Sequence, residues 1–158
     1  MTEQGLCYSI DITKDKWGET MVIEIDFNSD EALYIQLRNQ IIMGIAKDIL
    51  KDGESLPSVR QLANELGVNM HTVNKAYALL RQDGYVKLDR RNGAVVSVSL
   101  ENRTNHMQAL HSDMEMIVAQ AICKDISRVE MQALVSEMYD SFLTAQEALE
   151  ILSEEESK

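Results

Sequence analysis

The sequence contains few of the residues that form disulfide frameworks, metal sites or nucleophilic active sites. Its 158 residues include two cysteines and three histidines. Cys7 and Cys123 lie far apart without metal-like spacing, which predicts two reduced thiols. His106 and His111 are five positions apart, a poor spacing for two metal ligands on one helix face. Since the chain also lacks a glycine-rich phosphate loop and a nucleophile elbow, we predict that it is not an enzyme and uses neither metal nor cofactor.

Long hydrophobic runs are absent as well. No stretch approaches the roughly 20 apolar residues that a membrane span requires. The N-terminus does not have the basic start and apolar run of a secretory signal. These absences predict a cytoplasmic protein that does not contact a membrane.

An excess of positive charge occurs in one part of the chain only. The net charge is −11, which at first argues against a nucleic-acid partner. Residues 34–99, however, carry nine basic and six acidic side chains, whereas residues 1–33 carry two and eight, and residues 100–158 carry four and twelve. Because binding to phosphates depends on the local surface rather than on the total, the middle third remains a candidate nucleic-acid-binding region.

The first 20 residues show no hydrophobic periodicity. Two interpretations remain open for them: a loosely ordered tail, or a segment that precedes a natural translation start at Met21. After Met21, the residues VIEIDF alternate in the manner of a short strand. A helix over residues 32–51 is predicted next, because Leu37, Ile41 and Ile45 recur every four residues. Gly53 follows at a position typical of a helix C-cap.

Two short helices follow the chain's only proline, Pro57. Ser58 is placed as the N-cap of the first, VRQLANEL, and Gln61 completes a capping-box pattern. Asn69 is a favourable N-cap for the second helix, which follows a tight turn at Gly67. In the second helix, the stripe Val73, Ala76, Tyr77 and Leu80 predicts a buried face.

This pair of helices predicts a helix-turn-helix that presents its second helix to the major groove of DNA. With the apolar stripe buried, His71, Thr72, Asn74 and Lys75 project outward, where polar groups can reach base edges and phosphates. Two strands, Tyr85–Leu88 and Ala94–Leu100, flank a basic hairpin tip. The tip contains Arg90, Arg91 and Gly93.

Residues 104–123 and 127–152 are predicted to form two amphipathic helices. Ser127 and Glu130 form a capping-box pattern at the start of the second. Together these helices carry more apolar surface than a small winged domain can cover, which indicates an interface. We therefore divide the chain into an N-terminal tail (1–20), a winged helix-turn-helix domain (21–100) and a helical homodimerisation segment (101–158). The predicted fold is mostly α with a small β wing.

The segments YIQLRNQIIMGI and GESLPSVRQLANELGVNMHTVNKAYALLRQDGYV, with the hairpin after them, resemble the GntR family of bacterial regulators. The resemblance runs from about residue 32 to 98. It implies a winged helix-turn-helix that binds double-stranded inverted-repeat operators as a dimer. The short segment after the wing resembles the YtrA-type subfamily, which implies dimerisation through the tail, repression, and often the control of a transporter operon.

The resemblance also assigns roles to single residues. Arg60 matches an arginine that contacts DNA from the start of the second helix of the domain. Thr72 and Lys75 match contact positions of the recognition helix, with Asn74 beside them, and Gly93 matches a wing-tip glycine near the minor groove. The chain departs from the family at Ala32-Leu33, where a proline-bearing pair is usual, at Met70-His71, and in having one wing glycine where two are frequent.

From the residues themselves, we expect Ser58 and Asn69, with the neighbouring amides, to orient the domain on phosphates. Arg60 has two alternatives, a base or phosphate contact or an internal ion pair with Glu65 or a neighbouring carboxylate. The alternative function for the whole chain is a protein-interaction module without DNA binding. An unidentified small-molecule effector remains compatible with the sequence, in a pocket between the tail helices of a dimer.

Overall fold

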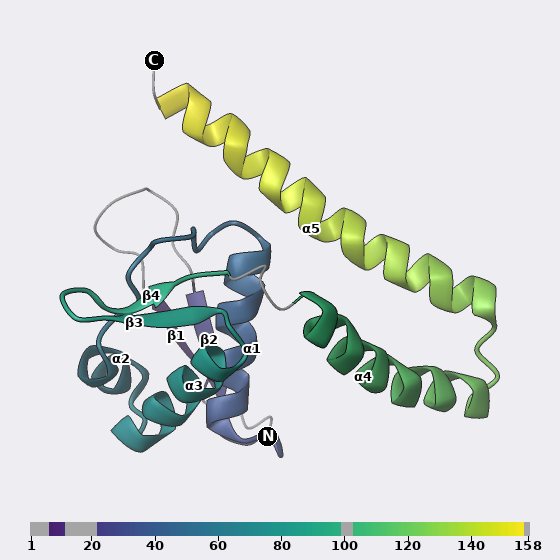
Figure 1. The fold of residues 1–158 in the computed structure, drawn as a ribbon, viewed down its shortest axis with the longest axis horizontal. Coiled ribbons are helices and arrows are strands. Elements are labelled where there is room, and N and C mark those ends of the chain that lie inside the picture. Colours follow the sequence, from purple (N-terminus) through teal and green to yellow (C-terminus); the bar gives the residue numbers. More distant parts are fainter. Residues whose placement is uncertain (1–6, 12–21, 99–102, 157–158) are drawn as a thin grey trace, which may run out of the picture. The chain divides into compact units, whose positions relative to one another are not determined.

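The computed structural model describes residues 7–11, 22–98 and 103–156. The chain divides into two compact units, Met1–Val98 and Ser99–Lys158. The first unit is a winged helix-turn-helix domain and the second is helical (Figure 1). The elements in chain order are β1 (Cys7–Asp11), β2 (Val22–Asp26), α1 (Leu33–Ala46), α2 (Val59–Leu66), α3 (Met70–Gln82), β3 (Val86–Asp89), β4 (Gly93–Val96), α4 (Arg103–Cys123) and α5 (Arg128–Glu156).

The strands β1 and β2 form an antiparallel ribbon in which Cys7 lies opposite Asp26 and Asp11 lies opposite Val22. The prediction of a tail without regular structure over residues 1–20 is therefore wrong at Cys7–Asp11. β2 supplies Ile23 and Ile25 to the core, which gives β1 a fixed strand to pair with. The other residues of the predicted tail, and Met21, lie outside the described residues.

Two glutamines of α1 bind the other edge of β2. The side-chain amide of Gln36 accepts a hydrogen bond from the Asp26 N–H (3.0 Å) and donates to the Asp26 carbonyl (3.0 Å). One turn later, the amide of Gln40 makes the same pair of bonds with the backbone of Glu24. A side-chain amide has the donor and acceptor of a backbone peptide. The two glutamines therefore satisfy a strand edge that would otherwise be unpaired.

Helix α1 is shorter than predicted. It ends at Ala46, five residues before the predicted end at 51. Asp48 adopts a left-handed conformation (φ 60°), and the N–H groups of Ile49 and Leu50 both donate to the carbonyl of Gly44. This C-terminal geometry usually uses glycine or asparagine, so the aspartate gave no stop signal. Gly53, predicted as the cap, instead donates its N–H to the Val96 carbonyl (2.9 Å).

The helix-turn-helix forms as the sequence predicts. Gly67 ends α2 in a left-handed conformation (φ 65°), and Asn69 caps α3 two residues later. The small side chain of Ala63, 2% exposed, lets α3 cross close to α2. The predicted stripe of α3 is buried, and it packs in one core with apolar residues of β2, α1, α2, β3 and β4.

The wing is the antiparallel hairpin β3–β4, with Val86 opposite Val96 and Asp89 opposite Gly93. The segment between α1 and α2 pairs with β4 through an isolated antiparallel bridge, with Ser55 opposite Val95. Leu56 donates its N–H to the Ala94 carbonyl (2.8 Å), and Val96 donates to the Glu54 carbonyl (2.8 Å). The base of the wing is thus joined to the chain just before α2, so the hairpin and the start of α2 hold fixed positions.

The C-terminal unit consists of α4 and α5, close to their predicted bounds. The predicted capping box is present, since Ser127 donates its N–H to the Glu130 carboxylate (2.8 Å) and Glu130 donates its N–H to the Ser127 hydroxyl (3.3 Å). The Ser127 hydroxyl also donates to the Glu130 carboxylate (2.6 Å), and this bond, followed by the one from the Ser127 N–H, lowers the pKa of Glu130. Among the described residues, no helix is long and apolar enough to cross a membrane.

Candidate nucleic-acid interface

The outer face of α3 carries most of the predicted contact residues. His71, Asn74 and Lys75 are exposed, as the burial of the opposite stripe requires. Thr72 is half-buried rather than fully projecting. The structure therefore brings three of the four predicted side chains fully to the surface in the N-terminal half of α3.

The two predicted N-caps hold the starts of α2 and α3. The Ser58 hydroxyl accepts a hydrogen bond from the Gln61 N–H (3.2 Å), and the Gln61 side chain accepts from the Ser58 N–H (3.2 Å). The Asn69 side-chain oxygen accepts from the His71 N–H (2.9 Å). Both side chains therefore stabilise helix ends, and their contact with phosphates stays a prediction.

Arg60 lies in the first turn of α2 and is exposed. The internal ion pair with Glu65, one of the two alternatives from the sequence, does not form. Among the side chains that the structure describes, those of residues 23–98 and 104–144, the single ion pair joins Arg38 to Asp83. The guanidinium of Arg60 thus remains available to an anionic or base-edge partner.

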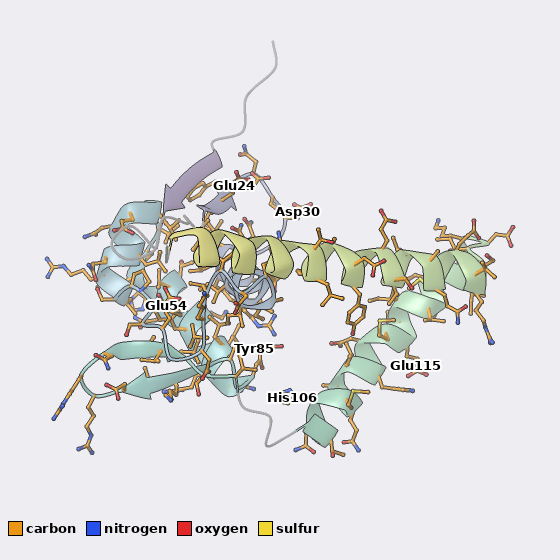
Figure 2. The ribbon with its side chains drawn as sticks, turned by 90° about the horizontal axis from the view of Figure 1, so that it is seen from above. Glu24, Asp30, Glu54, Tyr85, His106 and Glu115 are labelled. Atoms are coloured by element: carbon orange, nitrogen blue, oxygen red, sulfur yellow. The ribbon has the colours of Figure 1, made fainter. Side chains whose placement is uncertain are left out.

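The wing tip presents two arginines to solvent. Arg90 and Arg91 are exposed, in the loop between Asp89 and Gly93. The Asp89 carboxylate accepts hydrogen bonds from the N–H groups of Asn92 and Arg91 (2.8 Å each), and these bonds hold the pKa of Asp89 below its ordinary value. Gly93 has φ 72°, a conformation that favours glycine. Figure 2 shows nitrogen-bearing side chains at this tip, beyond the body of the domain.

Tyr77 connects the two helices of the motif, a role that sequence reasoning missed. Its position in the apolar stripe predicted burial, and it is 7% exposed. Its hydroxyl also donates a hydrogen bond to the Pro57 carbonyl (2.8 Å), one residue before the N-cap of α2. Burial, and then the charge of Glu65, raise the pKa of Tyr77, so the hydroxyl stays protonated and remains a donor.

We expect Tyr77→Phe to lower the free energy of unfolding by about 1–2 kcal/mol, because the Pro57 carbonyl would lose a partner in a poorly solvated place. Thermal or urea unfolding measures this change. Tyr85→Phe is the matched control, since no hydrogen bond of the Tyr85 hydroxyl is seen among the described residues. Equal stability of Tyr77→Phe and the wild type would show that this bond contributes nothing.

A second missed contact fixes the far end of α3. Arg38 of α1 donates from Nε (2.9 Å) and Nη2 (2.6 Å) to Oδ2 of Asp83, the C-cap of α3. One turn earlier on α1, the ring of Tyr34 lies under Lys75 Nζ, 3.7 Å from the ring centroid. Helix α1 therefore holds α3 at its end and near its middle. Cation–π and ion pairs between distant residues leave no local sequence pattern, which explains why they were missed.

The part of the chain that the structure describes contains no group of three or more histidine, cysteine, aspartate or glutamate side chains that could hold a metal ion. The C-terminal unit has a shallow, mostly apolar groove, which is lined by Met114, Met131, Gln132, Val135 and Ser136.

Comparison with known proteins places this geometry among bacterial regulators. The profile described as "Bacterial regulatory proteins, gntR family" matches residues 32–96. The HTH-type transcriptional repressor YtrA of Bacillus subtilis is 38% identical over 76 residues, which cover 48% of this chain and 58% of that protein. The chain spans about three fifths of the length of the first two curated relatives, 58% and 62%.

Two solved structures are similar to this chain, one in sequence and fold and the other in fold. YtrA from Sulfolobus acidocaldarius, described as a GntR-family transcription factor, is 38% identical with a TM-score of 0.54, over 64% of this chain and 97% of that one. A protein of Listeria monocytogenes EGD-e described as a transcriptional antiterminator has a TM-score of 0.67 at 21% identity, over 75% of this chain and 90% of that one. The second likeness concerns the fold alone.

Proposed function

The chain belongs to the GntR family of bacterial DNA-binding transcriptional regulators, and we propose that it represses transcription by binding an inverted-repeat operator as a homodimer. The observation that carries the proposal is the exposure of cationic and polar side chains on three elements of the first unit. They are Arg60 of α2, the outer side chains of α3 and the two wing arginines. The arginines at the start of α2 and at the hairpin tip can bind phosphates on either side of a DNA groove. The outer side chains of α3 can then contact base edges inside that groove.

The homodimer is proposed from the apolar surface of α4 and α5. Between residues 104 and 144, where side chains are described, only Ala121 is buried. Apolar side chains recur along one face of α4 and are partly open to solvent. Examples are Leu110, Ile117 and Val118, which are 40–53% exposed. A second copy offers the same face, and a two-fold dimer matches an inverted repeat.

Repression is proposed by analogy with the Bacillus subtilis relative, which is an HTH-type transcriptional repressor. The resemblance to short YtrA-type regulators extends the proposal to a transporter operon, and a regulator of this kind acts in the cytoplasm. A small-molecule effector would have its most direct site in the groove beside Met114 and Met131, where apolar and hydroxyl groups meet.

The decisive experiment is selection of duplexes from a random pool by the full-length protein. We expect an enriched inverted repeat, whose half-site spacing reports the geometry of the dimer. Transcription from a promoter that carries the selected site should fall when the protein is added. Enrichment of a single unrepeated site would contradict the dimeric operator, and increased transcription would contradict repression.

We expect the wing to act mainly through charge. Replacing both Arg90 and Arg91 with alanine should weaken binding to all duplexes alike. It should also reduce the salt slope, the slope of the logarithm of the binding constant against the logarithm of the salt concentration, by up to about 2. Fluorescence anisotropy at several salt concentrations measures both effects. Lys87→Ala, also on the wing and exposed, is a control for the loss of a charge away from the tip. A salt slope unchanged by the double substitution would mean that the arginines remain in solvent.

A further inference from the structure

We propose that Tyr34 is a positioning residue for DNA binding, which holds the ammonium group of Lys75 ready for a phosphate on the outer face of α3. The proposal rests on the DNA binding described above. Its starting point is the contact between the two side chains, with Lys75 Nζ 3.7 Å from the centroid of the Tyr34 ring. An ammonium group at this distance over a ring face is attracted by the negative face of the π system.

The ring is a fixed platform rather than a mobile surface group. Tyr34 is half-buried and packs against the hydrophobic core. One turn later on the same helix, Arg38 makes its bonds to Asp83 at the end of α3. The distance between α1 and α3 is therefore set by contacts that do not involve Lys75, and the ring stays in place whether or not the lysine rests on it.

The choice of an aromatic partner has a chemical consequence. A carboxylate beside Lys75 would offset its charge and compete with a phosphate for the same donors. Over the part of the chain that the structure describes, Lys75 has no ion pair, since the one pair present is that of Arg38 and Asp83. A ring restrains the flexible side chain and leaves the full positive charge and the N–H donors that point away from the ring available.

Restraint matters because lysine loses much rotamer freedom when it is immobilised on binding. If the ring already restricts the side chain in the free protein, less of that freedom remains to be lost on DNA. Tyr34 is thus expected to contribute to affinity without touching the duplex. Its contribution should depend entirely on Lys75.

The test is a double-mutant cycle on the full-length protein, with a labelled duplex of mixed sequence at low salt as the probe. Tyr34→Leu should weaken binding about two- to fivefold, whereas Tyr34→Phe, which keeps the ring, should bind within about twofold of the wild type. In the Lys75→Met background, Tyr34→Leu should have no further effect, because the cation that the ring holds is gone. Tyr85→Leu is the control for loss of a different half-buried ring, and its effect should be the same in both backgrounds.

Three results would overturn the proposal: equal effects of Tyr34→Leu in the two lysine backgrounds, tighter binding without the ring, or a loss on Tyr34→Phe as large as on Tyr34→Leu. A measurement on the wild type does not depend on the folding of any variant. The ε-methylene protons of Lys75 should resonate upfield of ordinary lysines because of the ring current, and an ordinary shift would also overturn it. Absence of any duplex binding by the wild type would instead refute the proposed function.

Discussion

Deleting residues 99–158 should turn a dimeric operator-binding protein into a monomer that binds about 100-fold more weakly or worse. In a dimer the second half-site is bound at a high effective concentration, and linkage of this kind raises affinity by about 10² to 10⁴. The division of the chain into two compact units at Val98 and Ser99 gives the truncation point. Sedimentation equilibrium and anisotropy with the selected operator measure the two effects. A truncated protein that stays dimeric would refute the assignment of the interface to α4 and α5.

A single substitution separates loss of the interface from loss of the whole unit. Ile117 lies in the apolar face of α4 and is 46% exposed, so Ile117→Glu should keep the helix but place a charge in the dimer interface. Ser112, exposed on the opposite face of α4, provides the matched control Ser112→Glu. Only the first should dissociate the dimer. If both variants dissociate, the added charge acts on the helix rather than on the interface.

The parts of the fold that the sequence predicts well are those set by local chemistry. The Ser58 and Asn69 caps, the left-handed Gly67 and the buried stripe of α3 each follow from residues within one or two helical turns. These features also fix which side chains of α3 face outward. The sequence therefore predicts those residues of the candidate site that lie on the side of a helix opposite a periodic apolar stripe.

The features that sequence reasoning missed depend on contacts between distant segments. Gln36 and Gln40 look like ordinary polar positions of a helix, yet they bind the backbone of β2. The early end of α1 depends on Asp48 in a conformation that aspartate adopts less readily than glycine. The ring under Lys75 lies 41 positions away in the sequence, where no local pattern could connect the two. In each case tertiary packing selects one of several states that the local sequence allows.

Arg60→Ala should weaken binding to the selected operator by about 1–3 kcal/mol and relax the preference at one position of the half-site. Arg60 is exposed in the first turn of α2, and the ion pair with Glu65 that would have occupied it is absent from the described residues. An arginine fork matches the O6 and N7 acceptors of guanine, whereas a lysine is a flexible point charge. Lys75→Ala should accordingly weaken binding to all sequences and reduce the salt slope by about 1.

The two substitutions thus distinguish a residue that contacts a base edge from a residue that binds a phosphate, on two neighbouring helices. Each variant is measured against a panel of single-base operator changes at two salt concentrations. The Lys75→Ala variant should keep the wild-type order of preference among the four bases at every operator position. The Arg60→Ala variant should lose its preference among bases at one position. Arg81→Ala is the control for removing a cation from α3 near its C-terminus, where Arg81 is exposed, and it should leave base preferences unchanged. Uniform weakening by Arg60→Ala with all base preferences intact would mean that Arg60 binds phosphate, and that the bases are read by α3 alone.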